Sequence, residues 1–171
     1  MIELENLARR FQDVKEDYFQ SLEVISKNEN VVNGNYVALA EQKLRELSGR
    51  KYAALVRTGS NAITISLQSY VAKGAEVIIP NYSCPATLSS VVVAGCIPRF
   101  VEINEYGSID ASQIQSHLTK NTKAILATGL YGDVHDHDTI KEICDKNNLV
   151  YVNDAAQSQF ALYKGTNSLE L

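Results

Sequence analysis

The sequence contains little cysteine and has no long apolar run. Its three cysteines, Cys84, Cys96 and Cys144, are widely spaced and include no C-x-x-C pair, so we expect reduced thiols rather than a disulfide framework or a zinc knuckle. No apolar stretch reaches the roughly 18–20 residues that span a bilayer, and residues 1–10 carry acidic side chains where a secretory signal would be apolar. We therefore expect a cytoplasmic protein without a membrane partner.

The sequence also lacks an excess of charge of one sign. The formal net charge is −4, and Lys and Arg are scattered rather than gathered into a basic stripe, which argues against nucleic acid as a partner. The composition, 45% hydrophobic and 21% charged over 171 residues, is that of an ordinary globular protein with enough length for one core.

Helical periodicity dominates the first part of the chain. Apolar residues recur at spacings of three and four over Leu4–Ile25, which predicts an amphipathic helix whose apolar face docks on another surface. A second helix is expected over Tyr36–Leu47, where Gly49 ends it. We assign residues 1–49 to an amino-terminal helical segment and residues 50–171 to an α/β domain.

Short strand-like runs alternate with helix-length segments after Gly49. This alternation predicts right-handed crossovers and a mainly parallel sheet flanked by helices. The expected strands are Tyr52–Val56, Glu76–Pro80, Ile97–Ile103, Lys123–Thr128 and Leu149–Asn153.

The first candidate site is the junction Thr58-Gly59-Ser60, where a strand is expected to end and a helix to begin. Gly59 lets the backbone approach a ligand closely, and free N–H groups at a helix start favour an anion such as phosphate. Ser and Thr also precede helices simply as N-caps, and from this segment alone capping is the favoured interpretation.

The second candidate is Tyr82-Ser83-Cys84-Pro85, again between a strand and a helix. The Tyr82 ring has the shape to lie over a flat ligand, and Pro85 suits the first turn of the following helix. No cation in the sequence nearby would activate the Cys84 thiol, so a packed, inert cysteine is the favoured interpretation.

The run from Tyr131 to Asp138 contains His and Asp in alternation, which is suggestive of metal ligands. A tetrahedral site needs a further ligand at a defined spacing, and none stands out. We therefore assign no metal, and we expect Asp136 or Asp138 to cap a helix that continues through Cys144.

The most informative feature is Asp154, which follows an apolar strand and precedes small residues. A carboxylate at the carboxyl end of a strand lies where open α/β sheets bind ligands. When buried it needs a strong partner, and a protonated ring nitrogen would be one. Capping of the Ala155-Ala156 turn is an equal alternative for this residue alone.

Seven segments of the sequence are informative as an ordered set. They are Thr58–Ala62, Gly74–Pro80, Gly95–Glu102, Ile109–Asp110, Thr122–Ile125, Tyr131–Gly132 and Asn153–Gln157. The combination is far more specific than any one motif. From about Asn33 to the end of the chain it resembles the amino half of the DegT/StrS family of sugar aminotransferases.

The resemblance implies an incomplete large domain of the fold type I pyridoxal-phosphate-dependent transferases, an α/β fold with a mainly parallel sheet flanked by helices. It further implies pyridoxal 5'-phosphate as the cofactor and a homodimer with active sites at the subunit interface. The expected reaction transfers an amino group, commonly from glutamate, to a keto sugar attached to a nucleotide.

The resemblance also assigns roles to individual residues. Gly59 and Ser60 hold the cofactor phosphate at the helix start. Asp154 pairs with the pyridine nitrogen and keeps it protonated, while Gln157 lies near the 3-oxygen of the ring. The full set of expected cofactor-binding residues is Thr58, Gly59, Ser60, Tyr82, Cys84, Asp154 and Gln157.

Two positions depart from the family pattern, and the family's Schiff-base lysine has no match in this sequence. Cys84 stands where many members have an aromatic ring that stacks on the cofactor, and Gly129 stands where many have His. Lys164 is the only lysine after Asp154, and its setting resembles a surface turn of the family rather than the segment of the Schiff-base lysine. We therefore expect no catalytic residue within this chain.

The resemblance also predicts an incomplete sheet. In fold type I enzymes two further strands lie between the strands expected at Tyr52–Val56 and Leu149–Asn153. Without them both expected strands have unpaired inner edges, which invite another chain to complete the sheet. We expect a rearranged or oligomeric fragment.

Several functions stay open from the sequence. The chain is a portion of a sugar aminotransferase, with pyridoxamine-dependent dehydration as a related activity, or it is a non-catalytic, truncated paralogue that acts as an association module. A nucleotide-binding α/β domain ranks last, because the sequence has neither G-x-G-x-x-G nor G-x-x-x-x-G-K-[ST].

Overall fold

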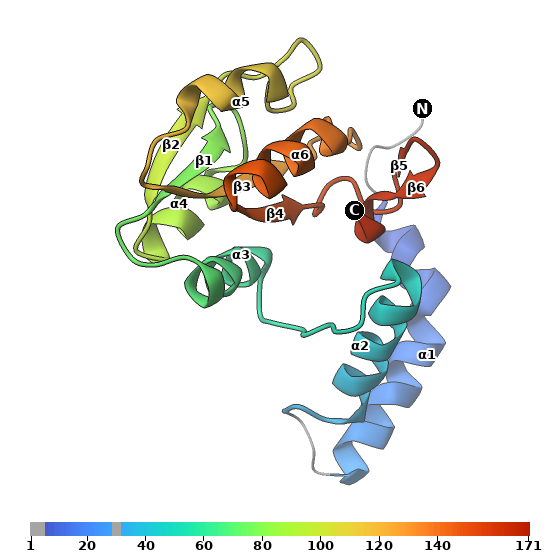
Figure 1. Cartoon of the computed structure of the whole chain (residues 1–171). Coiled ribbons are helices and arrows are strands. Elements are labelled where there is room, and N and C mark those ends of the chain that lie inside the picture. Colours follow the sequence, from blue (N-terminus) through green and yellow to red (C-terminus); the bar gives the residue numbers. More distant parts are fainter. Residues whose placement is uncertain (1–5, 29–31) are drawn as a thin grey trace.

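Four parallel strands form the central sheet of the computed structural model, which describes residues 6–28 and 32–171 (Figure 1). The strands are β1 (Glu76–Pro80), β2 (Ile97–Val101), β3 (Thr122–Thr128) and β4 (Val150–Asp154). Their order in the sheet is β2-β1-β3-β4, and every neighbouring pair is parallel. Four of the five predicted strands are thereby confirmed, as is the parallel arrangement.

Two pairs of helices cover the two faces of this sheet (Figure 1). They are α3 (Gly59–Tyr70) and α4 (Pro85–Val93) on one face, and α5 (Ala111–His117) and α6 (His137–Asn147) on the other. Successive strand side chains alternate between the layers: Val77 and Ile79 pack under α3 and α4, and Ile78 packs under α5 and α6. Because both faces are covered, the inner strands consist of continuous apolar residues.

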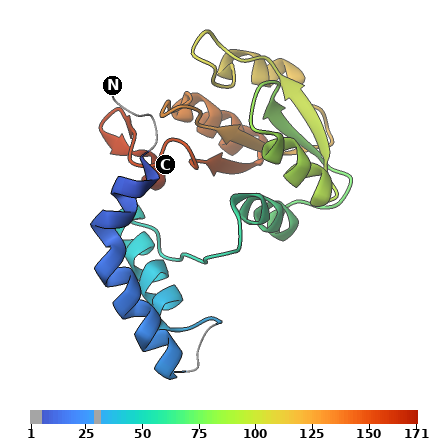
Figure 2. The same ribbon diagram turned by 180° about the vertical axis from the view of Figure 1, so that it is seen from behind.

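Two long helices precede the sheet and project away from it as a hairpin (Figures 1 and 2). They are α1 (Leu7–Asn28) and α2 (Asn35–Ser48), and they confirm the two predicted helices. The first residues of the predicted helix, before residue 6, lie outside the described part of the chain. None of the residues of α2 is buried, and Val14 and Tyr18 of α1 are more than half exposed.

The predicted strand at Tyr52–Val56 is wrong. Residues 51–57 run from α2 to α3 as an irregular connection that pairs with none of the four strands (Figure 2). Tyr52 is 77% exposed, and the Leu55 N–H donates to the Glu41 side chain over 2.9 Å. A strand needs a ladder partner, and the described residues supply no partner to this segment.

The chain turns back along the sheet after β4. A short hairpin of β5 (Leu162–Tyr163) and β6 (Thr166–Asn167) leads into a 3-10 turn, η1 (Ser168–Glu170). The Asn153 side chain of β4 donates to the Ser168 carbonyl over 3.1 Å. This bond fixes the end of the described chain beside the outer edge of β4.

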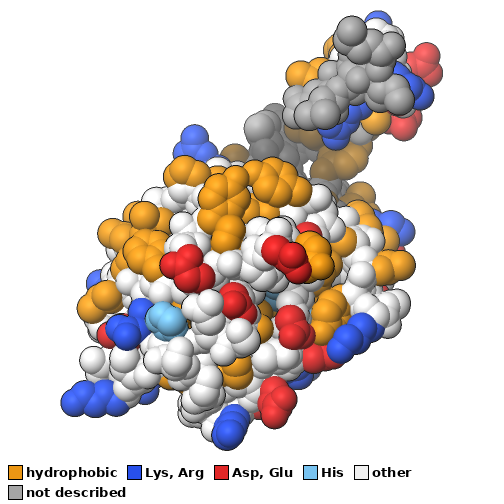
Figure 3. All heavy atoms as spheres, turned by 90° about the horizontal axis from the view of Figure 1, so that it is seen from above, with side chains coloured by type: hydrophobic (Ala, Val, Ile, Leu, Met, Phe, Trp, Pro, Cys, Tyr) orange, Lys and Arg blue, Asp and Glu red, His pale blue; other side chains and the backbone are white. Residues whose placement is uncertain are grey.

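The three cysteines are free thiols in the structure. Cys84 is exposed, whereas Cys96 and Cys144 are buried, and burial raises the pKa of the Cys144 thiol to about 12. Within residues 6–28 and 32–171, none of the helices has both the length and the apolar character needed to cross a membrane. On the face seen in Figure 3, Lys and Arg side chains lie scattered among acidic and hydrophobic ones.

Candidate functional site

A pocket of ≈ 190 Å³ lies outside the carboxyl ends of β3 and β4, the edge at which open α/β sheets bind ligands. The start of α3, the residues around the start of α4 and the turn after β4 form its walls. The structure brings five of the seven expected cofactor-binding residues into it. These five are Gly59, Ser60, Cys84, Asp154 and Gln157.

Asp154 is the last residue of β4 and is only partly buried. Its Oδ1 accepts a hydrogen bond from the Ala156 backbone N–H over 3.1 Å, which is the turn-capping alternative left open by the sequence. No other described group bonds to this carboxylate. Capping therefore occupies one oxygen, and the second oxygen is free to accept a hydrogen bond from a ligand in the pocket.

The start of α3 presents unpaired backbone donors to the same pocket. Thr58 is the N-cap, and its Oγ1 accepts from the Asn61 N–H over 3.1 Å. The N–H groups of Gly59 and Ser60 have no acceptor among the described residues, and they lie at the positive end of the helix dipole. Thr58 thus caps the start of α3 without lining the pocket.

Gln157 is oriented by the backbone of a neighbouring loop. Its Oε1 accepts a hydrogen bond from the Tyr131 N–H over 3.2 Å, so its side-chain NH2 is the group left to donate. Tyr82 does not line the pocket. It is 49% exposed, and its hydroxyl lies 2.9 Å from the Tyr131 hydroxyl.

Four residues that line the pocket were not among those expected from the sequence: Ile63, Ala86, Thr128 and Ala156. Thr128 is the informative one, because it is 4% exposed and its Oγ1 is buried without a hydrogen-bond partner. A buried hydroxyl without a partner costs about 1–3 kcal/mol. The pairing of β3 with β4, which sets Thr128 beside Asp154, is the signal that would have found it.

These groups define the ligand that the pocket suits. The start of α3 favours an anionic group such as a phosphate, while the free oxygen of Asp154 favours a cationic N–H donor. Small or apolar side chains, including Ile63, Cys84 and Ala156, form much of the remaining wall. The arrangement fits a compact ring that carries an anion on one side and a protonated nitrogen on the other.

The His and Asp run of the sequence forms a separate cluster behind β4. His135 Nε2 lies 2.5 Å from the Tyr151 hydroxyl, and His137 Nδ1 lies 3.1 Å from the same oxygen. Burial lowers the pKa of His135 to about 4 and also lowers the pKa of His137. Asp136 caps α6 by accepting a hydrogen bond from the Thr139 N–H. Of the two predicted caps, Asp136 and Asp138, the structure thus has Asp136.

No group of three His, Cys, Asp or Glu side chains with metal-binding geometry occurs within residues 6–28 and 32–171. Lys164 lies in the turn of the β5–β6 hairpin, where it forms a 2.5 Å ion pair with Asp138. It does not line the pocket that contains Asp154.

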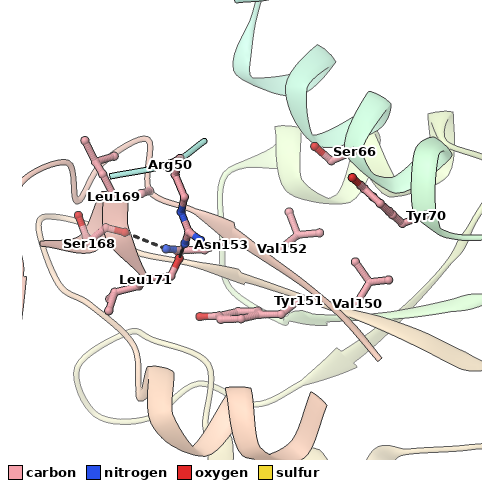
Figure 4. A pocket seen from close by; sticks show the side chains of 11 residues that line it. Arg50, Ser66, Tyr70, Val150, Tyr151, Val152, Asn153, Ser168, Leu169 and Leu171 are labelled. Atoms are coloured by element: carbon pink, nitrogen blue, oxygen red, sulfur yellow. Dashed lines mark hydrogen bonds between the residues drawn. The ribbon is translucent and has the colours of Figure 1, made fainter. Parts of the chain in front are cut away.

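A second hollow, of ≈ 420 Å³, lies along β4. Figure 4 shows Val150, Val152 and Asn153 of β4 below Ser66 and Tyr70 of α3, with Arg50 and the end of the chain to the left. β4 has only β3 as a neighbour. Its other edge is therefore open toward this hollow.

Comparison with known proteins gives a consistent result. The model of the DegT/DnrJ/EryC1/StrS aminotransferase family matches residues 12–169. The chain is 33% identical to a "Pleiotropic regulatory protein" of Geobacillus stearothermophilus over 94% of its own length and 44% of that relative. It is 31% identical to the UDP-2-acetamido-2-deoxy-3-oxo-D-glucuronate aminotransferase of Pseudomonas aeruginosa, over 100% of the chain and 48% of the relative.

Among solved structures, NtdA of Bacillus subtilis with bound cofactor PMP is similar. It has a TM-score of 0.84 and 30% sequence identity, covering 89% of this chain and 35% of NtdA. This likeness confirms the predicted fold class, an incomplete large domain of fold type I. The chain spans less than half the length of each of these relatives.

Proposed function

The chain belongs to the DegT/DnrJ/EryC1/StrS aminotransferase family, and on that premise we propose that it supplies the cofactor-binding part of a pyridoxal-phosphate-dependent aminotransferase. The substrate we propose is a keto sugar attached to a nucleotide, with glutamate as the amino donor. The observation that carries this proposal is the single pocket that contains both the open start of α3 and the free oxygen of Asp154.

The residues of the pocket fit this cofactor. The unpaired N–H groups of Gly59 and Ser60 would bind its phosphate, and the free oxygen of Asp154 would accept a hydrogen bond from its ring nitrogen. The NH2 group of Gln157, held by the contact with Tyr131, would donate to the 3-oxygen. When bound, pyridoxal phosphate supplies an electron-accepting ring to the carbon from which a proton departs.

Asp154 has the most consequential role in this arrangement. Its negative charge favours the protonated form of the ring nitrogen, because an adjacent opposite charge stabilises a cation. The Ala156 N–H bond fixes the carboxylate in place, so no reorganisation is needed when the ring binds. Cys84 lies in the pocket wall, where a thiol offers a small apolar contact in place of an aromatic one.

Two open surfaces support a partner for this chain. The free edge of β4 lies beside the hollow in Figure 4, and segment 51–57 is unpaired. Two parallel strands placed between them would complete the sheet and cover both.

The apolar stripe of α1 is exposed, and we propose that it contacts a second copy in a homodimer.

A titration with pyridoxamine phosphate tests the cofactor site. We expect the unchanged chain to bind it and Asp154→Asn to bind at least about tenfold more weakly, because a charge-assisted hydrogen bond contributes about 1.5–3 kcal/mol. Asp138→Asn is the matched control, since it neutralises a carboxylate that is paired with Lys164 outside the pocket. Equal affinity of Asp154→Asn and the unchanged chain would contradict the proposal.

The transferase activity needs its own assay. A protein that contains this chain together with the remaining strands is expected to transfer the amino group of glutamate to a nucleotide-linked keto sugar. Asp154→Asn in that protein is expected to abolish the transfer. Release of the deoxygenated sugar instead of the amino sugar would favour the dehydration alternative.

A non-catalytic association module is the second candidate. The exposed apolar face of α1 favours it, and one relative carries the name of a regulatory protein. Self-association without any binding of pyridoxamine phosphate would support this candidate over the first.

A further inference from the structure

Thr128 holds one of two buried side-chain polar atoms that have no hydrogen-bond partner among the described residues. The other atom, His135 Nδ1, belongs to a ring that is already held through its Nε2 by Tyr151. The Thr128 hydroxyl has no such second contact. It is also the only one of the two that lines a pocket on the ligand-binding edge of the sheet.

The two ends of β3 provide an internal comparison. Thr122, at the start of the strand, is 2% exposed, and its Oγ1 bonds to the Thr119 N–H over 2.9 Å and to Glu76 Oε2 over 3.3 Å. Thr128, at the other end, is buried to nearly the same degree, but its Oγ1 has no hydrogen-bond partner among the described residues. The fold therefore provides partners for the hydroxyl of Thr122, whereas it leaves the hydroxyl of Thr128, a residue that lines the pocket, without one.

The position of Thr128 relates it directly to Asp154. The two residues are paired in the β3–β4 register, and both line the pocket. The next peptide group donates from the Gly129 N–H to the Asp154 carbonyl over 3.0 Å. Side chains that are opposite one another in neighbouring strands lie on the same face, so the side chains of Thr128 and Asp154 lie on the same face of the sheet.

Gly129 cannot provide this polar group instead. A Cβ at this residue would lie 2.3 Å from Ser158 Oγ and 2.7 Å from the Asp133 carbonyl oxygen, so the backbone has no room for a side chain. The end of β3 can therefore offer the pocket one polar side chain, that of Thr128.

We propose that Thr128 is a cofactor-contacting residue whose hydroxyl donates a hydrogen bond to the ring-borne oxygen of the bound cofactor. The proposal rests on the proposed function, since it takes a phosphorylated hydroxypyridine as the ligand. In this arrangement the Asp154 carboxylate binds the ring nitrogen, and the Thr128 hydroxyl donates to the ring oxygen alongside the NH2 group of Gln157. The hydroxyl has a partner only in the ligand-bound protein.

Two substitutions of Thr128 test this assignment in the full chain. Thr128→Val is nearly isosteric and removes the hydroxyl, whereas Thr128→Ser keeps it. We expect Thr128→Val to bind pyridoxamine phosphate about tenfold more weakly, equivalent to about 1.4 kcal/mol, and Thr128→Ser to bind within about twofold of the unchanged chain. An analogue without the ring oxygen should bind equally to the unchanged chain and to Thr128→Val.

The stability of the ligand-free protein gives an independent readout. Because the hydroxyl is unsatisfied there, Thr128→Val is expected to leave the urea midpoint unchanged or to raise it. A purely structural role predicts the reverse pattern, a lower midpoint with unchanged affinity for pyridoxamine phosphate. That pattern, or equal affinity of Thr128→Val and the unchanged chain, would overturn the assignment.

The failure of this assignment is distinguishable from the failure of the proposed function. If Asp154→Asn weakens binding and Thr128→Val does not, only the role of Thr128 is wrong. If the unchanged chain binds no pyridoxamine phosphate, the proposed function is wrong and the role of Thr128 is refuted with it.

Discussion

Residues 59–171, the sheet region, differ from residues 6–28 and 32–57, the helical arm, in how far they bury their apolar side chains. In the sheet region Leu67 and Ile78 are fully buried, one in each of the two layers that cover the strands. In the arm Val14 is 54% exposed. The sheet region thus carries its own core, whereas the apolar stripe of the arm is arranged for contact with another surface.

The largest expected effect comes from truncating the same side chain in each region. Leu67→Ala should lower the free energy of unfolding by about 3 kcal/mol, because it leaves a cavity in a packed core. Leu39→Ala in α2, where Leu39 is 58% exposed, should change the unfolding free energy by less than about 0.5 kcal/mol. Urea denaturation of the two variants measures both values.

A large loss of unfolding free energy in Leu39→Ala would contradict the expectation that the side chains of the arm are exposed in a single chain. If the loss depends on protein concentration, a second copy covers the arm, as the dimer proposal requires. If it does not, the arm packs against its own chain more extensively than the structure indicates.

The sheet region should also lose stability in acid through His135. Burial, aided by the charge of His137 and opposed by Asp133 and Asp136, lowers its folded-state pKa to about 4, against 6.5 for an unperturbed histidine. Between these values the unfolded state binds more protons, so the unfolding free energy should fall as the pH falls from 6.5 to 4, by on the order of 3 kcal/mol.

His135→Gln isolates this contribution, because glutamine does not titrate and can still bond to the Tyr151 hydroxyl. Urea midpoints measured every half unit of pH should show a shallower acid slope in the variant. The same slope in both proteins would show that His135 does not control the acid response of the sheet region.

The smallest expected effect concerns one left-handed residue in each region. Phe160 of the sheet region has φ +64°, and Asn33 of the arm has φ +52°. Asn adopts this conformation more readily than Phe, for which it costs roughly 1–2 kcal/mol. Phe160→Asn should therefore raise the unfolding free energy by about 1 kcal/mol, while Asn33→Phe should not raise it. A lower midpoint for Phe160→Asn would mean that the ring, 53% exposed, makes contacts that outweigh the backbone strain.

Local patterns in the sequence were sufficient for much of the fold. The apolar runs identify β1 and β3 because these inner strands are largely buried, whereas the outer strands β2 and β4 are only partly buried. The cap of α6 was narrowed from residue type to Asp136 or Asp138, and the structure has Asp136. The strand expected at Tyr52–Val56 failed because a strand depends on a neighbour, which local composition does not encode. The apolar residues of this segment alone do not make it a strand.

The candidate site was predictable to a similar degree. Asp154 and the Gly59-Ser60 turn are visible as residues at the ends of expected elements. Thr128 was hidden inside an apolar run, and only the pairing of β3 with β4 reveals an unsatisfied hydroxyl beside Asp154. The ring of Tyr82 suggested stacking on a ligand, but Tyr82 does not line the pocket, and its hydroxyl lies 2.9 Å from that of Tyr131.

The protonation state of the bound ring nitrogen tests the central claim most directly. Pyridoxamine phosphate labelled with 15N at the ring can be observed by NMR in the chain, at a pH where the free ring nitrogen is unprotonated. The account predicts a protonated nitrogen in the unchanged chain and an unprotonated one in Asp154→Asn. A bound nitrogen that stays unprotonated in the unchanged chain would contradict it.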